Sequence, residues 1–413
     1  MLIDITLKNF RSFKGEATLS LETGSRLSKY KDTNTFTWKN SKIPSLVKSA
    51  FIFGPNANGK TSVLRAFELI SALLKNPTSD IEDELITDTF ADNDEGSMFK
   101  VNFTKNEHLF TYFLYYDKSE IIEEYLDYDG KRVLHRQRQN FIITPDLLSP
   151  IIKTIRKNQL LLFVAQSYNY EVAQMAFTWF TKDVVFIRNN AMTINSDVLR
   201  QLRDSVNFKE RLLNFMQAAD FGINDFEIVE RPGITSIIDE ETHELRFVRS
   251  QEKKQLELSL RHQTENGGTF LLPLSAESEG TKIFVALALQ LLVNSGQGKL
   301  LLIDEFERSL HFELAQALLQ IFNHEKQANQ FVLTTHNLEL MDEKLRVDQI
   351  WFVEKNEYSE SSLYSLFDFE LSSVKRGDYS YKKRYIMGTF GAKQIVNQKR
   401  LIQNVFQDAP EII

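Results

Sequence analysis

A glycine-bordered loop between a predicted strand and a predicted helix constrains the fold of this chain more than any other feature. The loop reads Gly54-Pro-Asn-Ala-Asn-Gly59-Lys60-Thr61, follows the apolar run 46–53 and opens a helical pattern over 60–74. Glycines let successive backbone N–H groups converge on phosphate oxygens at a helix N-terminus. A strand that leads into such a loop and helix is typical of an α/β sheet. The sequence therefore predicts an α/β fold built around a phosphate-binding loop.

Two further apolar runs, 299–303 and 330–334, fit the same sheet, because helical patterns over 281–293 and 313–322 alternate with them. These strands lie far along the chain from the phosphate loop. We therefore expect one nucleotide-binding head in two parts that a large α+β insertion interrupts. The predicted division is 1–76 for the first part of the head, 77–265 for the insertion, 266–349 for the second part of the head and 350–413 for a small C-terminal extension.

Composition excludes several other classes of protein. The chain has 413 residues, 42% of them hydrophobic and 25% charged, and no run of 18 apolar residues that could span a membrane. It has no cysteine and seven scattered histidines, which excludes disulfides and cysteine-based zinc sites. A metal here should therefore be a hard ion bound by oxygen, such as Mg2+. Since no apolar signal segment begins the chain, we expect a cytoplasmic protein with no membrane association.

Side chains in the loop and at the ends of the later strands are candidates for the chemistry. Lys60 would neutralise phosphate charge and the Thr61 hydroxyl would bind Mg2+. Asp304 and Glu305 end an apolar strand, where the first could bind Mg2+ and the second could polarise an attacking water. His336 follows the next strand and could bind a γ-phosphate, although a lone histidine more often has a structural role. Further loop contacts with the nucleotide are expected from Gly54, Asn56, Asn58, Gly59 and Ser62.

A fourth motif, Ser278-Glu-Gly280-Thr281, opens the apolar helix, and on its own Ser278 is first of all a helix N-cap. In this order, the four motifs resemble the ABC-type ATPase heads of the SMC, RecF and OLD group. The resemblance implies that Ser278 and Gly280 form the signature motif, which contacts ATP held by another copy of the chain. It also identifies Ser309-Leu-His311 with the D-loop. A head-to-tail homodimer or a higher oligomer with two shared ATP sites would follow.

The amino-acid sequences of the motifs and of the residues around them resemble more closely the RloA/AbiL-like branch of bacterial phage-defence ATPases. The segments that carry this likeness are 7–13, 46–60, 303–311 and 383–391. It implies an ATPase of an abortive-infection system that controls a separately encoded effector, such as a nuclease or a toxin. Arg11 matches a family position near the nucleotide, but a salt-bridged surface arginine is an equally good interpretation. The Q-loop of this family has only Gln137 and Gln139 as candidates.

The charge distribution leaves nucleic acid open as a partner. The net charge of −7 gives no general attraction for it, yet residues 375–400 hold eight Lys and Arg against one Asp. This segment is either a solvated surface or a docking face, and the alternative function is a DNA-repair or recombination ATPase of the RecF or SMC type. The aromatic residues of the predicted insertion are expected to be core rather than a binding surface: Phe110, Tyr112, Phe113, Tyr115 and Tyr116.

Overall fold

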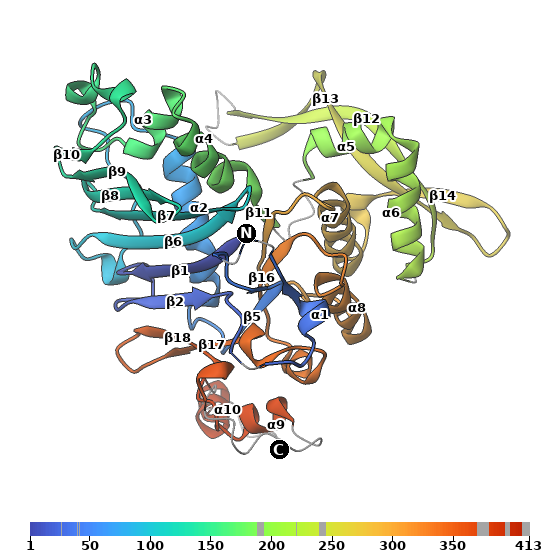
Figure 1. Cartoon of the computed structure of the whole chain (residues 1–413). Helices are drawn as coiled ribbons and strands as arrows, with labels where there is room; N and C mark the ends of the chain where they lie inside the picture. Colours follow the sequence, from blue (N-terminus) through green and yellow to red (C-terminus); the bar gives the residue numbers. More distant parts are fainter. Residues whose placement is uncertain are drawn as a thin grey trace.

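The computed structural model describes residues 1–25, 27–38, 40, 42–187, 194–219, 221–238, 245–369, 380–392 and 397–406, and for 232–238 and 245–254 the backbone alone. Two large sheets lie next to each other, and a third, smaller sheet stands apart with two helices (Figure 1). The predicted α/β fold class is confirmed.

The first large sheet is mainly parallel and holds the phosphate loop. Its six strands run in the order β11 (Val184–Ile187), β15 (Leu300–Ile303), β16 (Gln330–Thr334), β5 (Ser49–Phe53), β17 (Ile350–Lys355) and β18 (Ser361–Ser365). Neighbours are parallel except β17 and β18, which form a hairpin. Every residue of β5, β15 and β16 is buried, as expected for central strands of a covered parallel sheet. The carboxyl ends of these strands therefore meet at one edge.

The second large sheet is antiparallel. Its seven strands run in the order β10 (Asn140–Ile143), β9 (Lys131–Gln137), β8 (Ile121–Tyr128), β7 (His108–Tyr116), β6 (Ser97–Lys105), β1 (Leu2–Lys8) and β2 (Ala17–Ser20). Alternate residues of β7 are buried, so this sheet has one core face and one partly exposed face. The buried Gln330 side chain links the two sheets, because it accepts from Leu2 N at 2.7 Å and donates to the carbonyls of Leu2 and Val47 at 3.0 and 3.1 Å.

Helices cover these sheets. The long helix α2 (Lys60–Lys75) follows the phosphate loop and packs into the same hydrophobic core as the antiparallel sheet. Two short helices, α3 (Leu161–Ser167) and α4 (Glu171–Thr178), join that core. A second core contains the helix α8 (Phe312–Phe322) and the other face of the parallel sheet. The four-residue helix α1 (Lys31–Asn34) precedes a small two-stranded sheet of β3 (Thr35–Phe36) and β4 (Leu46–Val47).

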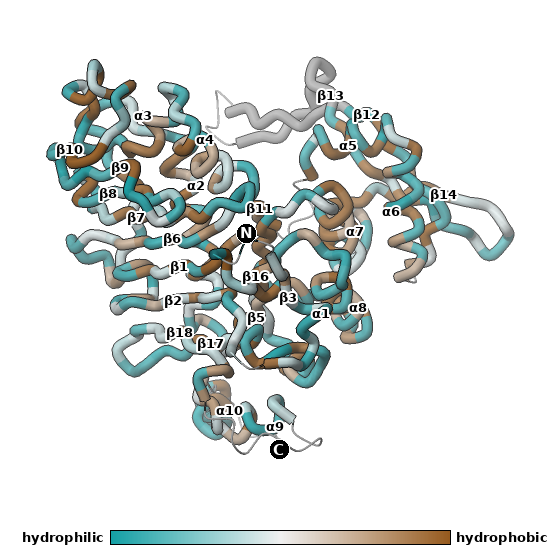
Figure 2. Tube along the Cα trace, in the orientation of Figure 1, coloured by the Kyte–Doolittle hydropathy of each residue, from teal (hydrophilic) through white to brown (hydrophobic). Residues whose placement is uncertain are grey.

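The third sheet forms an arm with a core of its own. Its strands are β12 (Ile223–Ile238), β13 (Leu245–Gln263) and β14 (Thr269–Pro273), and the helices α5 (Ser196–Asp204) and α6 (Val206–Ala218) pack on it. Helix α7 (Glu279–Val293) joins the arm to the head. Its residues Val285, Ala288 and Leu289 lie in the core of the arm, whereas Phe284, Leu287 and Leu291 lie in the core of the head. This double burial explains why the helix is mostly apolar after Lys282, which stands out in Figure 2.

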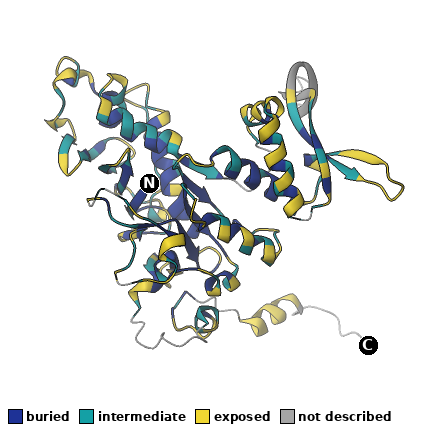
Figure 3. Ribbon diagram, turned by 45° about the vertical axis from the view of Figure 1, so that its right-hand side comes forward, coloured by how far each residue is buried: buried dark blue, intermediate teal, exposed yellow. Residues whose placement is uncertain are grey.

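The described part of the tail contains the helices α9 (Tyr381–Ile386) and α10 (Gln398–Phe406). Tyr385 and Phe390 stack on Phe352 of β17 at centroid distances of 5.5 and 5.7 Å. Helix α10, in contrast, is exposed over residues 398–405 (Figure 3).

The predicted division of the chain needs correction, because strand pairing crosses its boundaries. β6 to β10 belong to the predicted insertion 77–265, yet they extend the sheet of β1, and β11 borders the parallel sheet. β17 belongs to the predicted extension, yet it pairs with β5. The segment that stands apart is shorter, from α5 to β14. Local patterns indicate that strands exist, but they do not show which distant strand each one pairs with. The aromatic cluster follows this alternation: Phe110, Tyr112 and Tyr116 are buried, while Phe113 and Tyr115 are partly exposed.

Candidate nucleotide site

The phosphate loop has a backbone that favours glycine at both of its ends. Gly54 and Gly59 have φ angles of 151° and 105°, and Ala57 between them has a φ of 62°. A Cβ atom on Gly54 would lie 2.4 Å from the carbonyl oxygen of Val353, and one on Gly59 would lie 2.3 Å from Ser12 Oγ. Other segments of the chain therefore press on the loop from two sides, and only glycine leaves room for them.

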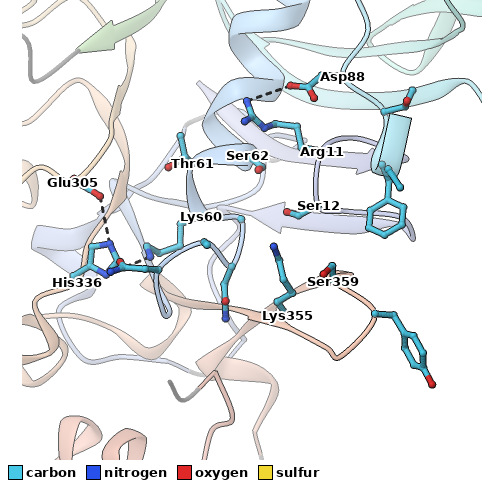
Figure 4. A pocket seen from close by; sticks show the side chains of 18 residues that line it. Arg11, Ser12, Lys60, Thr61, Ser62, Asp88, Glu305, His336, Lys355 and Ser359 are labelled. Atoms are coloured by element: carbon cyan, nitrogen blue, oxygen red, sulfur yellow. Dashed lines mark hydrogen bonds and ion pairs between the residues drawn. The ribbon is translucent and has the colours of Figure 1, made fainter. Parts of the chain in front are cut away.

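A pocket of about 870 Å3 opens beside this loop (Figure 4). Its walls come from six parts of the chain: the turn after β1, the phosphate loop with the start of α2, the segment before β6, and the ends of β15, β16 and β17. The lining residues are Arg11, Ser12, Asn56, Ala57, Asn58, Gly59, Lys60, Thr61, Ser62, Asp88, Thr89, Phe90, Ala91, Glu305, His336, Lys355, Tyr358 and Ser359.

Lys60 is the buried cation of the pocket. Its ammonium donates to the carbonyl oxygens of Gly54 and Pro55 at 2.8 and 2.9 Å, and it lies 3.4 Å from His336 Nδ1. Burial lowers the pKa of Lys60 to about 8, although the nearby charges of Glu305 and Asp304 act in the opposite direction. An ammonium whose bonds go to neutral carbonyl oxygens and whose neighbour is an imidazole would be stabilised by an anionic oxygen, which suits a phosphate.

Thr61 and Asp304 form a second cluster that fits a magnesium ion. Thr61 Oγ1 lies 3.1 and 3.0 Å from the two carboxylate oxygens of Asp304. The Thr334 hydroxyl donates to Asp304 Oδ1 at 2.5 Å and accepts from the backbone N–H of Glu305 at 2.8 Å. These two hydrogen bonds fix the position of the Asp304 carboxylate. Mg2+ is bound by one or two protein oxygens together with waters and substrate phosphates, and Thr61 and Asp304 would be those protein ligands.

Glu305 and His336 stand at the end of the pocket next to Lys60. Glu305 has a φ of 47°, an unusual backbone for a residue that is not glycine, and its Oε1 lies 3.5 Å from His336 Nε2. Burial and the charge of Lys60 lower the pKa of His336. The carboxylate of Glu307 accepts the backbone N–H groups of His336 and Asn337 at 2.7 and 3.2 Å, which fixes the histidine's position. The end of β15 and the end of β16 thus place a carboxylate and an imidazole face to face.

Arg11 lies at the pocket, and it is also ion-paired. The turn that carries it is closed by two hydrogen bonds between Phe10 and Phe13, at 2.8 and 2.9 Å. Arg11 Nη1 lies 3.3 Å from Asp88 Oδ2, and its backbone N–H donates to the Asp88 carbonyl at 2.7 Å. Arg11 is therefore both a salt-bridged residue and a residue in the wall of the pocket, so the two interpretations of its role are compatible.

Ser278 and Gly280 do not line the pocket of their own chain. Ser278 caps α7, where its hydroxyl accepts from the Thr281 N–H at 3.2 Å, and it is exposed. A Cβ atom on Gly280 would lie 2.7 Å from the carbonyl oxygen of Ser309, so the start of α7 touches the predicted D-loop. Gln137 and Gln139, the candidates for a Q-loop, do not line the pocket either.

The sequence did not predict several residues that the fold brings to the pocket: Ser12, the run 88–91, Lys355, Tyr358 and Ser359. Ser12 lies in the segment 7–13, which carries part of the family resemblance, so its position next to Arg11 could have indicated that it lines the pocket. Residues 88–91 lie in the acidic stretch, and 355–359 lie in the β17–β18 turn; neither has a local pattern that indicates nucleotide binding.

Within the described residues, no group of three or more His, Asp or Glu side chains could hold a metal ion by itself. Among the helices that the structure describes, none has both the length and the apolar composition of a membrane span.

Residues 49–342, more than half of the chain, match the family described as "AAA domain, putative AbiEii toxin, Type IV TA system". The chain belongs to this family. No curated protein sequence matches this chain.

Solved structures with a related arrangement include three SMC heads. An SMC head bound to the C-terminal winged-helix domain of ScpA has 12% sequence identity and a TM-score of 0.46, covering 90% of this chain and 98% of its own. The SMC head domain from Thermotoga maritima has 15% identity and a TM-score of 0.40, covering 88% and 98%. An SMC head from Pyrococcus furiosus, with an extended coiled coil and the C-terminal domain of ScpA, has 11% identity and a TM-score of 0.44, covering 90% and 97%.

Proposed function

We propose that this AAA-domain protein hydrolyses Mg-ATP to ADP and phosphate and acts as a nucleotide-dependent dimeric switch. One observation carries the proposal. Three segments distant in sequence bring Lys60, Thr61, Asp304, Glu305 and His336 to one edge of the parallel sheet, while the signature segment at Ser278 stays exposed outside the pocket. Such an arrangement is an ATP site that lacks only its second half.

The residues have distinct roles in this proposal. The phosphate loop and Lys60 bind the phosphates, and Thr61 and Asp304 hold Mg2+, which supplies charge neutralisation when bound. Glu305 orients and polarises the attacking water, since it lies at the pocket end next to Lys60. His336, whose pKa is lowered by burial and by the charge of Lys60, can hydrogen-bond to a γ-phosphate oxygen through a ring N–H.

The second half of the site comes from a second copy. The start of α7 presents an exposed Ser278 and free backbone N–H groups, which suit an anionic phosphate oxygen. Because the same helix start contacts Ser309 of the predicted D-loop, closing one site would move a segment next to the carboxylate pair. The Ser278 hydroxyl already caps the helix. A contact with the nucleotide of the second copy would be an additional role of Ser278 beside this cap.

The biological role we propose is regulation in a bacterial anti-phage, abortive-infection system, where the ATPase controls a separate nuclease or toxin. The family description, which refers to a toxin and to toxin–antitoxin systems, supports this setting. The nucleic-acid alternative has less support. Much of the basic segment 375–400 lies outside the described residues, and within the described part Lys382 already pairs with Glu339 at 2.8 Å.

The test is the solution mass of the Glu305→Gln variant by light scattering, with and without Mg-ATP. Slow hydrolysis should trap ATP, and the mass should double if two heads close around it. Glu171→Gln, an exposed carboxylate at the start of α4, is the matched control and should hydrolyse ATP normally.

A second variant separates binding from closure. Ser278→Arg should still bind Mg-ADP, because Ser278 lies outside its own pocket, but it should block the doubling in the Glu305→Gln background. Normal turnover by Glu305→Gln would contradict its role as the group that polarises water. An ATP-independent mass in all variants would contradict the switch.

A further inference from the structure

The hairpin β17–β18 comes from the last part of the chain, yet it is built into the phosphate loop. Strand β17 continues past the end of β5, so that the Val353 carbonyl oxygen lies against Gly54. Ser361 on β18 donates its hydroxyl to the carbonyl of Asn58 at 2.6 Å, and its N–H donates to the Ser12 carbonyl at 2.7 Å. The hairpin is therefore fixed to both ends of the loop.

Lys355 stands at the end of β17, where this attachment places it inside the pocket. Figure 4 shows its side chain pointing into the pocket toward Ser12, on the side opposite Glu305 and His336. The parallel pairing of β17 with β5 puts Lys355 two residues beyond the contact at Gly54, next to the phosphate loop. The side chain is half-buried, so it is not a freely solvated lysine.

The charges around Lys355 distinguish it from Arg11 and Lys14. Arg11 is paired with Asp88, and Lys14 donates to Glu360 at 2.9 Å. Within the described part of the chain, the Lys355 side chain has no carboxylate within 4.0 Å and makes no hydrogen bond. A lysine without a counter-charge, held at a pocket wall by a rigid hairpin, is suited to an anionic ligand.

We propose that Lys355 is a further nucleotide-binding residue, a second cation that contacts phosphate on the side of the pocket away from Glu305. This inference rests on the proposed function. Since Lys355 lies away from Glu305 and His336, it should contribute to binding of ADP as much as of ATP. It should raise affinity equally in the ground state and the transition state, and so affect KM and not kcat.

The test measures the Kd of Mg-ADP by titration calorimetry for the wild-type chain, Lys355→Gln and Lys355→Arg. Mg-ADP is the probe because it lacks the γ-phosphate, which removes any coupling to head closure. A charge-assisted contact of this kind predicts a Kd roughly tenfold higher for Lys355→Gln, with partial recovery in Lys355→Arg. Lys382→Gln is the control, because Lys382 lies outside the pocket and should leave the Kd unchanged.

A Kd for Lys355→Gln within about twofold of the wild type would overturn the assignment, as would equal weakening by Lys382→Gln. In ATP hydrolysis, a loss confined to kcat would also overturn it. A wild-type chain that binds no Mg-ADP would instead refute the proposed nucleotide function, so the two failures are distinguishable.

Discussion

The buried charge of Lys60 should make the nucleotide-free protein less stable at neutral pH, and Lys60→Met tests this. The ordinary lysine pKa of 10.5 falls to about 8 in the folded chain. Between these values the unfolded chain binds more protons than the folded one, so stability rises with pH across this window. Below pH 8 the full destabilisation is present, and the gap between the two pKa values corresponds to about 3 kcal/mol.

Methionine removes this titration while keeping a similar side-chain length. The lost hydrogen bonds to Gly54 and Pro55 change the variant's stability by an amount that depends little on pH. The informative quantity is therefore how the stability difference between wild type and variant changes with pH. We expect the wild type to gain about 2 kcal/mol relative to Lys60→Met between pH 7.5 and pH 9.5.

Urea unfolding of both proteins without nucleotide, at these two pH values, measures that change. The control is Lys75→Met, the same substitution at the exposed end of α2, measured at the same two pH values. A stability difference between wild type and Lys60→Met that is the same at both pH values would refute the argument that burial of Lys60 is costly. Lys60→Met should in any case lose most of its nucleotide affinity.

Two further substitutions test the geometry of the site. Gly59→Ala should lower Mg-ADP affinity more than tenfold, because the added Cβ would meet Ser12 Oγ. The control is Gly130→Ala, which also has a positive φ of 79° but lies in open space and should bind Mg-ADP normally. Equal affinities of the two variants would mean that the phosphate loop can move aside. Thr61→Ala should weaken Mg-ADP binding roughly tenfold and leave metal-free ADP binding nearly unchanged. If both fall together, Thr61 contributes to the loop and not to the metal.

The ionisable side chains that the candidate nucleotide site places after its strands were predictable from the sequence. Asp304, Glu305 and His336 follow short apolar runs, and Lys60 follows the glycine loop after a third. The carboxyl ends of parallel strands share one edge of a sheet. Local pattern alone therefore implied that these side chains meet. The exposed cap at Ser278 was also predictable, because an N-cap depends on only a few consecutive residues.

Only the tertiary structure decided which distant segments complete the pocket and where the head ends. β6 pairs with β1 and β17 pairs with β5, and in each case the partner is far away along the chain. Ser12, Asp88 and Lys355 reach the phosphate loop through those pairings. The physical reason is that periodicity encodes which face of an element is buried, whereas the choice of partner depends on packing between elements that share no local sequence signal.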